Sequence, residues 1–510
     1  MIKKDNRYKV ISYIVLISVM AITFFYIKGH LYTRLNSDDA SELILGKLLA
    51  SENTLISKNW YYSTELRVLN TNIFYALLFK FTDNFFVVRM VSYLLMWIAL
   101  LLIYFGLCKA LNIERNKIIS ACLLFIPFSD YYYSFVLSTA YYIPHIAISF
   151  LTIMFLELYL NKKKSVYLIS GGALALIAGL GGPRQILVTY LPLFLASLFT
   201  CLFNKDKDYS FFKYALIILM CSGIGYVINS KILHSYFTFA NYDDIRFKTF
   251  DIDRLVVLFN GFVLNYGYRL GKVMSTITIT NAIAGICILL SIYAIYYPLK
   301  HKDKVSDSYY RFSLFVLFAY LIFILLYAFT DMFYLDRYYL PIIILYVPLI
   351  ALFFNEVEIN IFNIKKTYIF TLFVLMIFAQ GVAYMYSYNN FDGNAERREI
   401  IKLLEDNDYK NGYASFWNGN VYTELSNGDI EIWVFQDTTL KSTQGFDELY
   451  KWLQVKDHMF NNPSGKVFVL LSGDEYKNTP LKKYLSKDNV VYNSDNYIVF
   501  GYDSYEELVA

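Results

Sequence analysis

Long apolar runs constrain the fold of this 510-residue chain more than any other feature. A helix needs about 20 apolar residues to cross the hydrocarbon of a bilayer, and about eleven stretches approach that length. They lie at roughly 10–27, 85–108, 117–137, 142–160, 166–182, 186–203, 214–233, 281–299, 312–330, 339–354 and 368–387. Charged residues make up only 17% of the chain, against roughly 25% in soluble domains. The sequence therefore predicts an α-helical polytopic membrane protein.

Lysine and arginine fall into every second connection between these runs. The basic positions are Lys3, Lys4, Arg7 and Lys9, then Lys109, Arg115 and Lys117, then 162–164, 205, 207 and 213, then 300, 302 and 304, and finally 365 and 366. Cytoplasmic loops carry such an excess, so we expect the N-terminus inside and, after an odd number of spans, the C-terminus outside. The first run is long for a signal peptide and predicts an uncleaved anchor in the cell membrane.

Two outer loops are long, and the chain ends in a polar region. The first loop, about 28–84, is expected to hold a helix at 39–50, an extended segment at 60–62 and an interfacial helix at 69–81. The second covers about 234–280. Residues 1–389 would form the transmembrane domain. Residues 390–510 predict a small extracytoplasmic α/β domain, with a helix at 396–406 and strands at 412–417, 430–435, 467–471 and 497–502.

The sequence lacks the motifs that would indicate a disulfide framework, a nucleotide-binding loop or a metal site. The five cysteines lie in or beside apolar runs, so no disulfide framework is expected. No glycine-rich phosphate loop appears, and neither nucleotide nor nucleic acid is an expected partner. His30 and His145 do not combine with cysteine into a metal set, so no metal ligands are assigned, although a divalent ion assisting the reaction is left open.

Two adjacent acids, Asp38 and Asp39, follow the first apolar run. Carboxylates are costly in lipid, so they belong in the outer loop, where one can act as a general base. The alternative is structural, because Ser37 or Asp38 could cap a helix that has Glu42 at the capping-box position. Glu65, in the same loop, is a further catalytic candidate.

Two arginines are candidate phosphate ligands. Arg184 lies in a turn, Gly181-Gly182-Pro183-Arg184-Gln185, and Arg337 precedes Tyr338 in a later outer segment. A guanidinium binds phosphate with two parallel hydrogen bonds. Alternatively, the Arg184 side chain extends from a helix end to the membrane–water interface, and Arg337 forms an ion pair with Asp336.

Other polar and aromatic residues allow two readings each. Asp130 either lines a cavity or marks the outer end of a short helix. Trp417 and Trp433 could stack on sugar rings or belong to the core of the C-terminal domain.

The order of these motifs resembles the GT-C membrane glycosyltransferases, which include protein O-mannosyltransferases and lipid A aminoarabinose transferases. The resemblance rests on the acid after the first span, the long first loop, the arginine turn and the late Arg337-Tyr338-Tyr339-Leu340-Pro341, over about residues 10–390. The mannosyltransferases have Asp-Glu where this chain has Asp38-Asp39.

The resemblance implies an inverting hexosyl- or pentosyltransferase on the outer face of the membrane. Its donor would be a polyprenyl-phosphate sugar and its acceptor a cell-envelope polysaccharide, glycolipid or protein. Asp38 or Asp39 would be the base, and Arg184, Arg337 and Tyr338 would contact the lipid phosphate. A transporter or flippase of a lipid-linked saccharide is the alternative; its ionisable residues would lie near the bilayer midplane.

Overall fold

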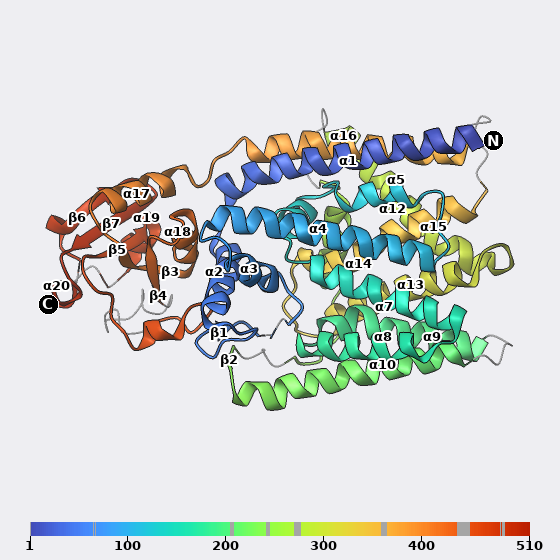
Figure 1. The fold of residues 1–510 in the computed structure, drawn as a ribbon, viewed down its shortest axis with the longest axis horizontal. Helices are drawn as coiled ribbons and strands as arrows, with labels where there is room; N and C mark the ends of the chain where they lie inside the picture. Colours follow the sequence, from blue (N-terminus) through green and yellow to red (C-terminus); the bar gives the residue numbers. More distant parts are fainter. Residues whose placement is uncertain are drawn as a thin grey trace.

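The protein consists of a bundle of long helices with an α/β domain at one end (Figure 1). The computed structural model describes residues 2–64, 66, 68–203, 209–240, 245–269, 277–358, 365–435, 449–479, 481 and 485–510. The N-terminus lies at the far end of the bundle and the C-terminus in the α/β domain (Figure 1). Hydrogen bonds and ring contacts at that far end join Tyr8 to Asn116 and Tyr368, so basic connections gather opposite the α/β domain.

Within the described residues, nine helices are long and apolar enough to cross a membrane. They are Arg7–Arg34, Phe85–Ala110, Ile143–Lys162, Ile186–Phe203, Ser210–Ser235, Ile279–Lys300, Asp307–Phe329, Asp336–Glu356 and Lys366–Asn389. A shorter apolar helix, α8 (Ser165–Leu180), accounts for the predicted run at 166–182. The polytopic helical fold expected from the sequence is confirmed.

The predicted span at 117–137 is not one helix. It consists of α5 (Lys117–Ala121), η1 (Cys122–Leu124), α6 (Asp130–Tyr132) and η2 (Tyr133–Leu137). Pro127 disfavours helical backbone in the residue before it, and Ser129 then caps a new helix by accepting a hydrogen bond from the Tyr132 N–H. Most of this broken segment is buried, so its irregular backbone is surrounded by protein.

The main spans bear the labels α1 (Ile2–Arg34), α4 (Phe85–Ala110), α7 (Ile143–Lys162), α10 (Ser210–Val227), α13 (Asp307–Phe329) and α16 (Lys366–Asn389). Helices α1 and α16 run side by side along one edge of the bundle (Figure 1). Helices α8 and α10 approach most closely, because a Cβ on Gly179 or Gly225 would collide with backbone carbonyls of the other helix. Small residues permit such backbone contact between membrane helices.

The first long loop folds against the α/β end of the bundle. It holds α2 (Ser37–Glu52), β1 (Tyr61–Tyr62) and α3 (Asn72–Leu78). The predicted helix at 69–81 is shorter than expected, and it packs on α2 where Gly46 leaves room for Tyr75. Strand β1 pairs in parallel with β2 (Thr238–Phe239) of the second long loop, so the two long loops are joined. The second loop also contains α11 (Ile252–Asn265).

The C-terminal domain contains a five-stranded mixed sheet in the order β4-β3-β5-β7-β6. The predicted helix and four strands are present as α17 (Ala395–Asp406), β3 (Asn411–Ser415), β4 (Glu431–Phe435), β5 (Val467–Ser472) and β7 (Tyr497–Tyr502). The edge strand β6 (Val490–Asn493) was not expected. Helix α18 (Asn420–Leu425) faces the bundle and packs on α2.

Candidate active site

The acid pair opens helix α2, but neither acid caps it. The N-cap is Asn36, whose extended backbone precedes the first helical residue and whose side chain accepts a hydrogen bond from the Asp39 N–H at 3.1 Å. The capping role considered for Ser37 or Asp38 is therefore wrong, because both residues already have helical backbone. Glu42 instead accepts a hydrogen bond from the Asn70 side chain at 3.1 Å.

Helix α2 presents three faces to three different surroundings. Residues four and seven apart lie on one face of a helix. Glu42, Leu45 and Leu49 line a pocket in the first loop. Ser37 and Ser41 bond Val421 and Asn420 of the C-terminal domain. Asp38 lies one turn before Glu42 and so shares the pocket face.

Asp39 lies on the third face, toward α4. Its backbone carbonyl accepts a hydrogen bond from Arg89 at 2.9 Å. Burial raises the pKa of the Asp39 carboxyl to about 8; Arg89 counteracts this, whereas Asp38, Glu424 and Glu42 add to it. Asp39 is therefore largely protonated at neutral pH, so of the two acids Asp38 fits the role of base better.

Arg89 forms the buried centre of this region and was not singled out from the sequence. Its side chain is 2% exposed and forms a two-pronged ion pair with Glu424 of α18, with 2.5 Å between the closest atoms. It also donates to the hydroxyls of Tyr93 at 2.8 Å and Tyr75 at 3.3 Å. The signal was present in the sequence, since an arginine inside an apolar run is costly unless it is paired.

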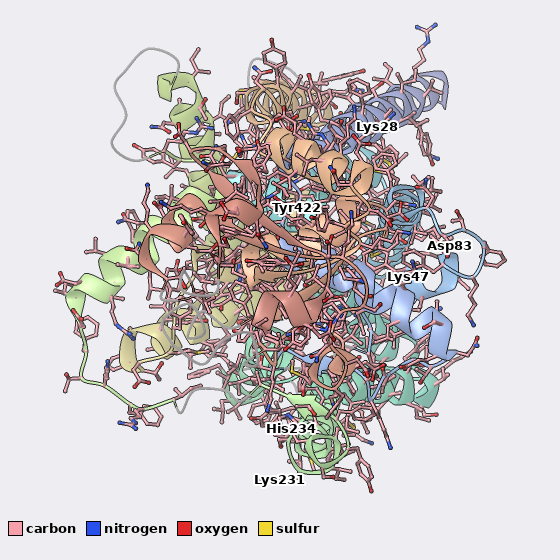
Figure 2. All side chains as sticks on the ribbon, turned by 90° about the vertical axis from the view of Figure 1, so that its left-hand side faces the viewer. Lys28, Lys47, Asp83, Lys231, His234 and Tyr422 are labelled. Carbon is pink, nitrogen blue, oxygen red and sulfur yellow. The ribbon has the colours of Figure 1, made fainter. Side chains whose placement is uncertain are left out.

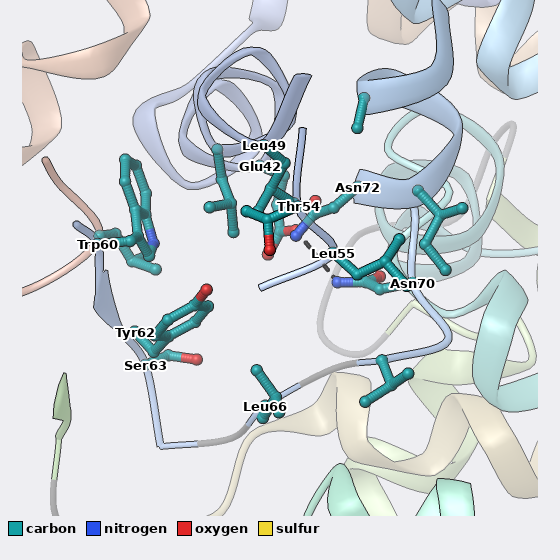
Figure 3. A pocket seen from close by; sticks show the side chains of 15 residues that line it. Glu42, Leu49, Thr54, Leu55, Trp60, Tyr62, Ser63, Leu66, Asn70 and Asn72 are labelled. Atoms are coloured by element: carbon teal, nitrogen blue, oxygen red, sulfur yellow. Dashed lines mark hydrogen bonds between the residues drawn. The ribbon is translucent and has the colours of Figure 1, made fainter. Parts of the chain in front are cut away.

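The loop pocket lies beside the face of α2 that carries Glu42 and Leu49 (Figure 3). It encloses about 560 Å³ of space not filled by protein atoms, part of it open to solvent. Its polar lining includes Glu42, Asn70 and Asn72, and Ser63 lies on the side of Trp60 and Tyr62 (Figure 3). The candidate acid Glu65 lies outside the described residues.

The structure brings Arg184 close to Tyr142 and to the segment that contains Arg337. The Arg184 guanidinium lies 5.6 Å from the ring centroid of Tyr142 and 5.9 Å from that of Tyr338, the neighbour of Arg337. Burial raises the pKa of Tyr142 to about 12, and both guanidinium charges oppose this rise. Both arginines are therefore within electrostatic reach of the Tyr142 hydroxyl.

Arg337 does not pair with Asp336, which was one of the readings of the sequence. Asp336 accepts a hydrogen bond from the Tyr131 hydroxyl at 2.9 Å, and the Arg337 guanidinium lies over the Phe135 ring at 4.7 Å. In the part of the chain that the structure describes, no carboxylate oxygen is within 4 Å of the Arg337 guanidinium. Its charge remains available to an anionic ligand.

The arginine turn also adjoins the loop pocket. A Cβ on Gly181 would lie 3.7 Å from the backbone oxygen of Leu66, which lines that pocket. The Asp38 face of α2, the first loop and the Arg184 turn thus form one continuous region at the end of the bundle that carries the C-terminal domain.

The other residues singled out from the sequence, His145, Asp130, Trp433 and Trp417, have different surroundings. His145 lies 3.2 Å from Arg184 through Nε2, and no group of three metal-ligand side chains occurs among the described residues. Asp130 begins α6 and is 3.8 Å from Arg269 in a partly exposed ion pair. Trp433 is buried and donates to the Asn461 carbonyl, as expected of a core residue, whereas Trp417 is 57% exposed.

Comparison with known proteins gives one kind of match. No protein-family model matches the chain, and no curated protein sequence matches it. Among solved structures, the fold is similar to that of ArnT from Cupriavidus metallidurans bound to undecaprenyl phosphate, with a TM-score of 0.55 and 10% identity over 96% of this chain and 97% of that one. The likeness covers both the bundle and the α/β domain. The chain therefore has an ArnT-like fold, as the resemblance in the order of its motifs predicted.

Proposed function

We propose that this protein is a membrane glycosyltransferase that takes a sugar from a polyprenyl-phosphate donor on the outer face of the membrane. The observation that carries the proposal is the position of the Arg184 guanidinium over Tyr142 and over Tyr338, the neighbour of Arg337, at the same end of the bundle as the acid pair. These residues are far apart in sequence. The fold supports the same donor, because the similar ArnT structure holds undecaprenyl phosphate.

In the proposed reaction, the Asp38 carboxylate removes the proton from an acceptor hydroxyl. The hydroxyl oxygen attacks the anomeric carbon, and the bond from that carbon to the phosphate oxygen breaks. The lipid phosphate leaves with the electron pair, and the guanidinium groups of Arg184 and Arg337 stabilise its charge. Attack opposite the leaving phosphate inverts the anomeric centre. The acceptor would be a polymer, glycolipid or protein of the cell envelope.

The positions of the charges speak against the transporter alternative. In the nine described spans, every Asp, Glu, Lys and Arg lies within about two turns of a span end. The buried pair Glu157–Arg311, for example, joins the ends of α7 and α13 that lie opposite the C-terminal domain. Transporters place ionisable and substrate-binding groups near the midplane, and the described spans have no Asp, Glu, Lys or Arg there.

Binding of undecaprenyl phosphate to the purified protein tests the proposal. Arg184→Ala and Arg337→Ala should each weaken binding roughly 10- to 100-fold, because each removes a charge-assisted contact. Arg7→Ala, an exposed arginine at the opposite end of the bundle, is the matched control and should bind normally. Equal losses in all three variants, or none in the first two, would remove the phosphate site.

A further inference from the structure

A second cavity, here called the domain groove, lies between α2 and the C-terminal domain. It contains about 840 Å³ of space not filled by protein atoms, part of it open to solvent. Its polar lining includes Lys47 and Ser51 from α2, and Thr423, Glu431 and His458 from the C-terminal domain. Figure 2 looks onto this end of the molecule and labels Lys47 beside the C-terminal domain. The proposed reaction uses none of these side chains.

Lys47 places in the groove a cation that no carboxylate of the described residues contacts directly. Its Nζ lies 4.8 Å from the ring centroid of Phe85, and among the described residues no carboxylate oxygen is within 4 Å of it. The one acidic side chain of the groove, Glu431, is already engaged by His458, with 2.9 Å between Oε1 and Nε2. A ligand that enters the groove therefore meets a cation without a carboxylate partner.

His458, which lines the domain groove, is held in place by its neighbours. Its ring stacks on Trp433 at 4.3 Å between centroids, and its Nδ1 lies 3.3 Å from the Gln454 Oε1. Gln454 is buried, and its amide group donates to the Val434 carbonyl at 2.9 Å, so its Oε1 faces His458. A wall fixed before binding reduces the entropy that a ligand must lose.

One residue, Trp60, separates the domain groove from the loop pocket. It lines both cavities (the loop pocket in Figure 3) and is 1% exposed. Among the described residues its indole N–H has no acceptor, so a hydrogen-bond donor remains unused in the wall between them. Segment 449–459 of the C-terminal domain secures this wall, because Trp60 forms a β-bridge with Val455 and Tyr61 bonds Leu453 and Gln454 through the backbone.

We propose that the domain groove binds an acidic saccharide and is a second subsite for the acceptor. This inference rests on the proposed glycosyl transfer. Polar side chains beside the apolar walls of Trp60 and Phe85 suit a hydroxyl-rich ring, and Lys47 suits its carboxylate or phosphate substituent. Lys47 lies nine residues after Asp38, or about 13 Å along the axis of α2 and about half a turn around it, so the two side chains lie on opposite faces of the helix. An acceptor with its reacting hydroxyl at Asp38 and an acidic unit at Lys47 is therefore an oligosaccharide long enough to pass around this helix.

Binding of two trisaccharides to the full-length protein tests the subsite. Trigalacturonate should bind in a salt-sensitive manner, whereas neutral maltotriose should bind at least 10-fold more weakly. Lys47→Gln should weaken trigalacturonate binding roughly 10- to 100-fold, and Glu431→Gln should strengthen it, because it removes the groove's negative charge. Lys466→Gln is the matched control: this lysine also lies over a ring, that of Tyr409, but outside the groove. It should leave binding unchanged.

Equal binding of the two sugars, or equal losses in Lys47→Gln and Lys466→Gln, would overturn the inference. Undecaprenyl phosphate binding, measured on the same samples, keeps the two proposals apart. Lys47→Gln should bind this lipid normally, since the phosphate site is elsewhere. A protein that binds trigalacturonate through Lys47 but does not bind the lipid would refute the donor and leave the groove as a saccharide site. A protein that binds the lipid but not trigalacturonate would refute the groove alone.

Discussion

At the residue scale, the sequence identified the two neighbouring acids but could not divide their roles. It placed Asp38 and Asp39 correctly at the start of a helix. Their surroundings are supplied by partners far away in the chain, Arg89 and Glu424 for Asp39, and these contacts are not visible in local spacing. Arg184 and Arg337 were found because arginine at a helix end is conspicuous, whereas the contacts of Arg184 with Tyr142 and with Tyr338, the neighbour of Arg337, depend on the fold.

Replacing each acid with asparagine should separate their roles. Asp38→Asn should reduce sugar transfer by about 10²–10⁴-fold, because the amide cannot accept the proton. Asp39→Asn should retain most of the activity, since the Asp39 side chain is already largely protonated at neutral pH. Transfer is measured as release of free undecaprenyl phosphate from its sugar conjugate in membranes, at matched protein levels. If Asp39→Asn is the inactive variant, the base has been assigned to the wrong residue.

The same pair of variants predicts a difference in pH dependence. The pKa of Asp39 is raised from an ordinary 3.8 to about 8 in the folded protein. The folded state therefore keeps a proton that the unfolded state has lost, and the free energy of unfolding falls as pH rises from about 4 to about 8. Asp39→Asn should lose this part of the slope, and Asp38→Asn should keep it. Thermal unfolding in detergent at several pH values measures both.

At the element scale, the lengths of the apolar runs predicted most of the helices. The prediction failed where a single residue changes the backbone conformation. The run at 117–137 is as apolar as its neighbours, but it is interrupted near Pro127 and starts again at Ser129. Strand β6 was missed because its residues, Val490–Asn493, are only partly buried and lie at the sheet edge, where the pattern is weak. The pairing of β1 with β2 joins two distant loops and has no local signal.

The crossing of α8 and α10 provides a test of helix packing. In Gly225→Ala the new methyl group would collide with the Leu176 carbonyl, and we expect a loss of about 1–3 kcal/mol in stability. Gly223→Ala is the matched control, since a Cβ there has no atom within 4 Å and lies on the same helix. Thermal unfolding of the purified variants should show a lower midpoint for Gly225→Ala only. Equal midpoints would show that the two helices are less closely packed.

At the scale of the whole molecule, the C-terminal domain is joined to the bundle by buried polar contacts. Glu424 pairs with Arg89, Asn420 bonds Ser41 at 2.7 Å, and the Gly393 N–H donates to the Thr33 carbonyl at 2.9 Å. The sequence predicted a separate soluble domain from its composition, but it gave no indication that this domain forms much of the domain groove and contributes Leu453 to the loop pocket. Composition identifies a polar domain, but it does not show which surfaces of the bundle that domain contacts.

Labelling of introduced cysteines tests the orientation of the whole molecule. Ser464→Cys, exposed in the C-terminal domain, should react with a membrane-impermeant maleimide on intact cells. Ser165→Cys, exposed at the opposite end of the bundle, should react only after permeabilisation. The reverse pattern would place the candidate active site in the cytoplasm. The native cysteines are buried or half-buried in apolar segments, so they contribute little background.

The ion pair between Arg89 and Glu424 also sets an order for biogenesis. Its members are 335 residues apart, and at typical synthesis rates of about 5–20 residues per second the arginine precedes its partner by roughly 20–70 s. During that interval the start of α4 carries a charge that favours water over lipid. The nascent chain therefore holds this end of α4 at the membrane surface until α18 is made. Docking of the C-terminal domain, which is synthesised last, then completes the contacts of the N-terminal half of the bundle. In a chain that stops before Glu424, Arg89 lacks this carboxylate partner.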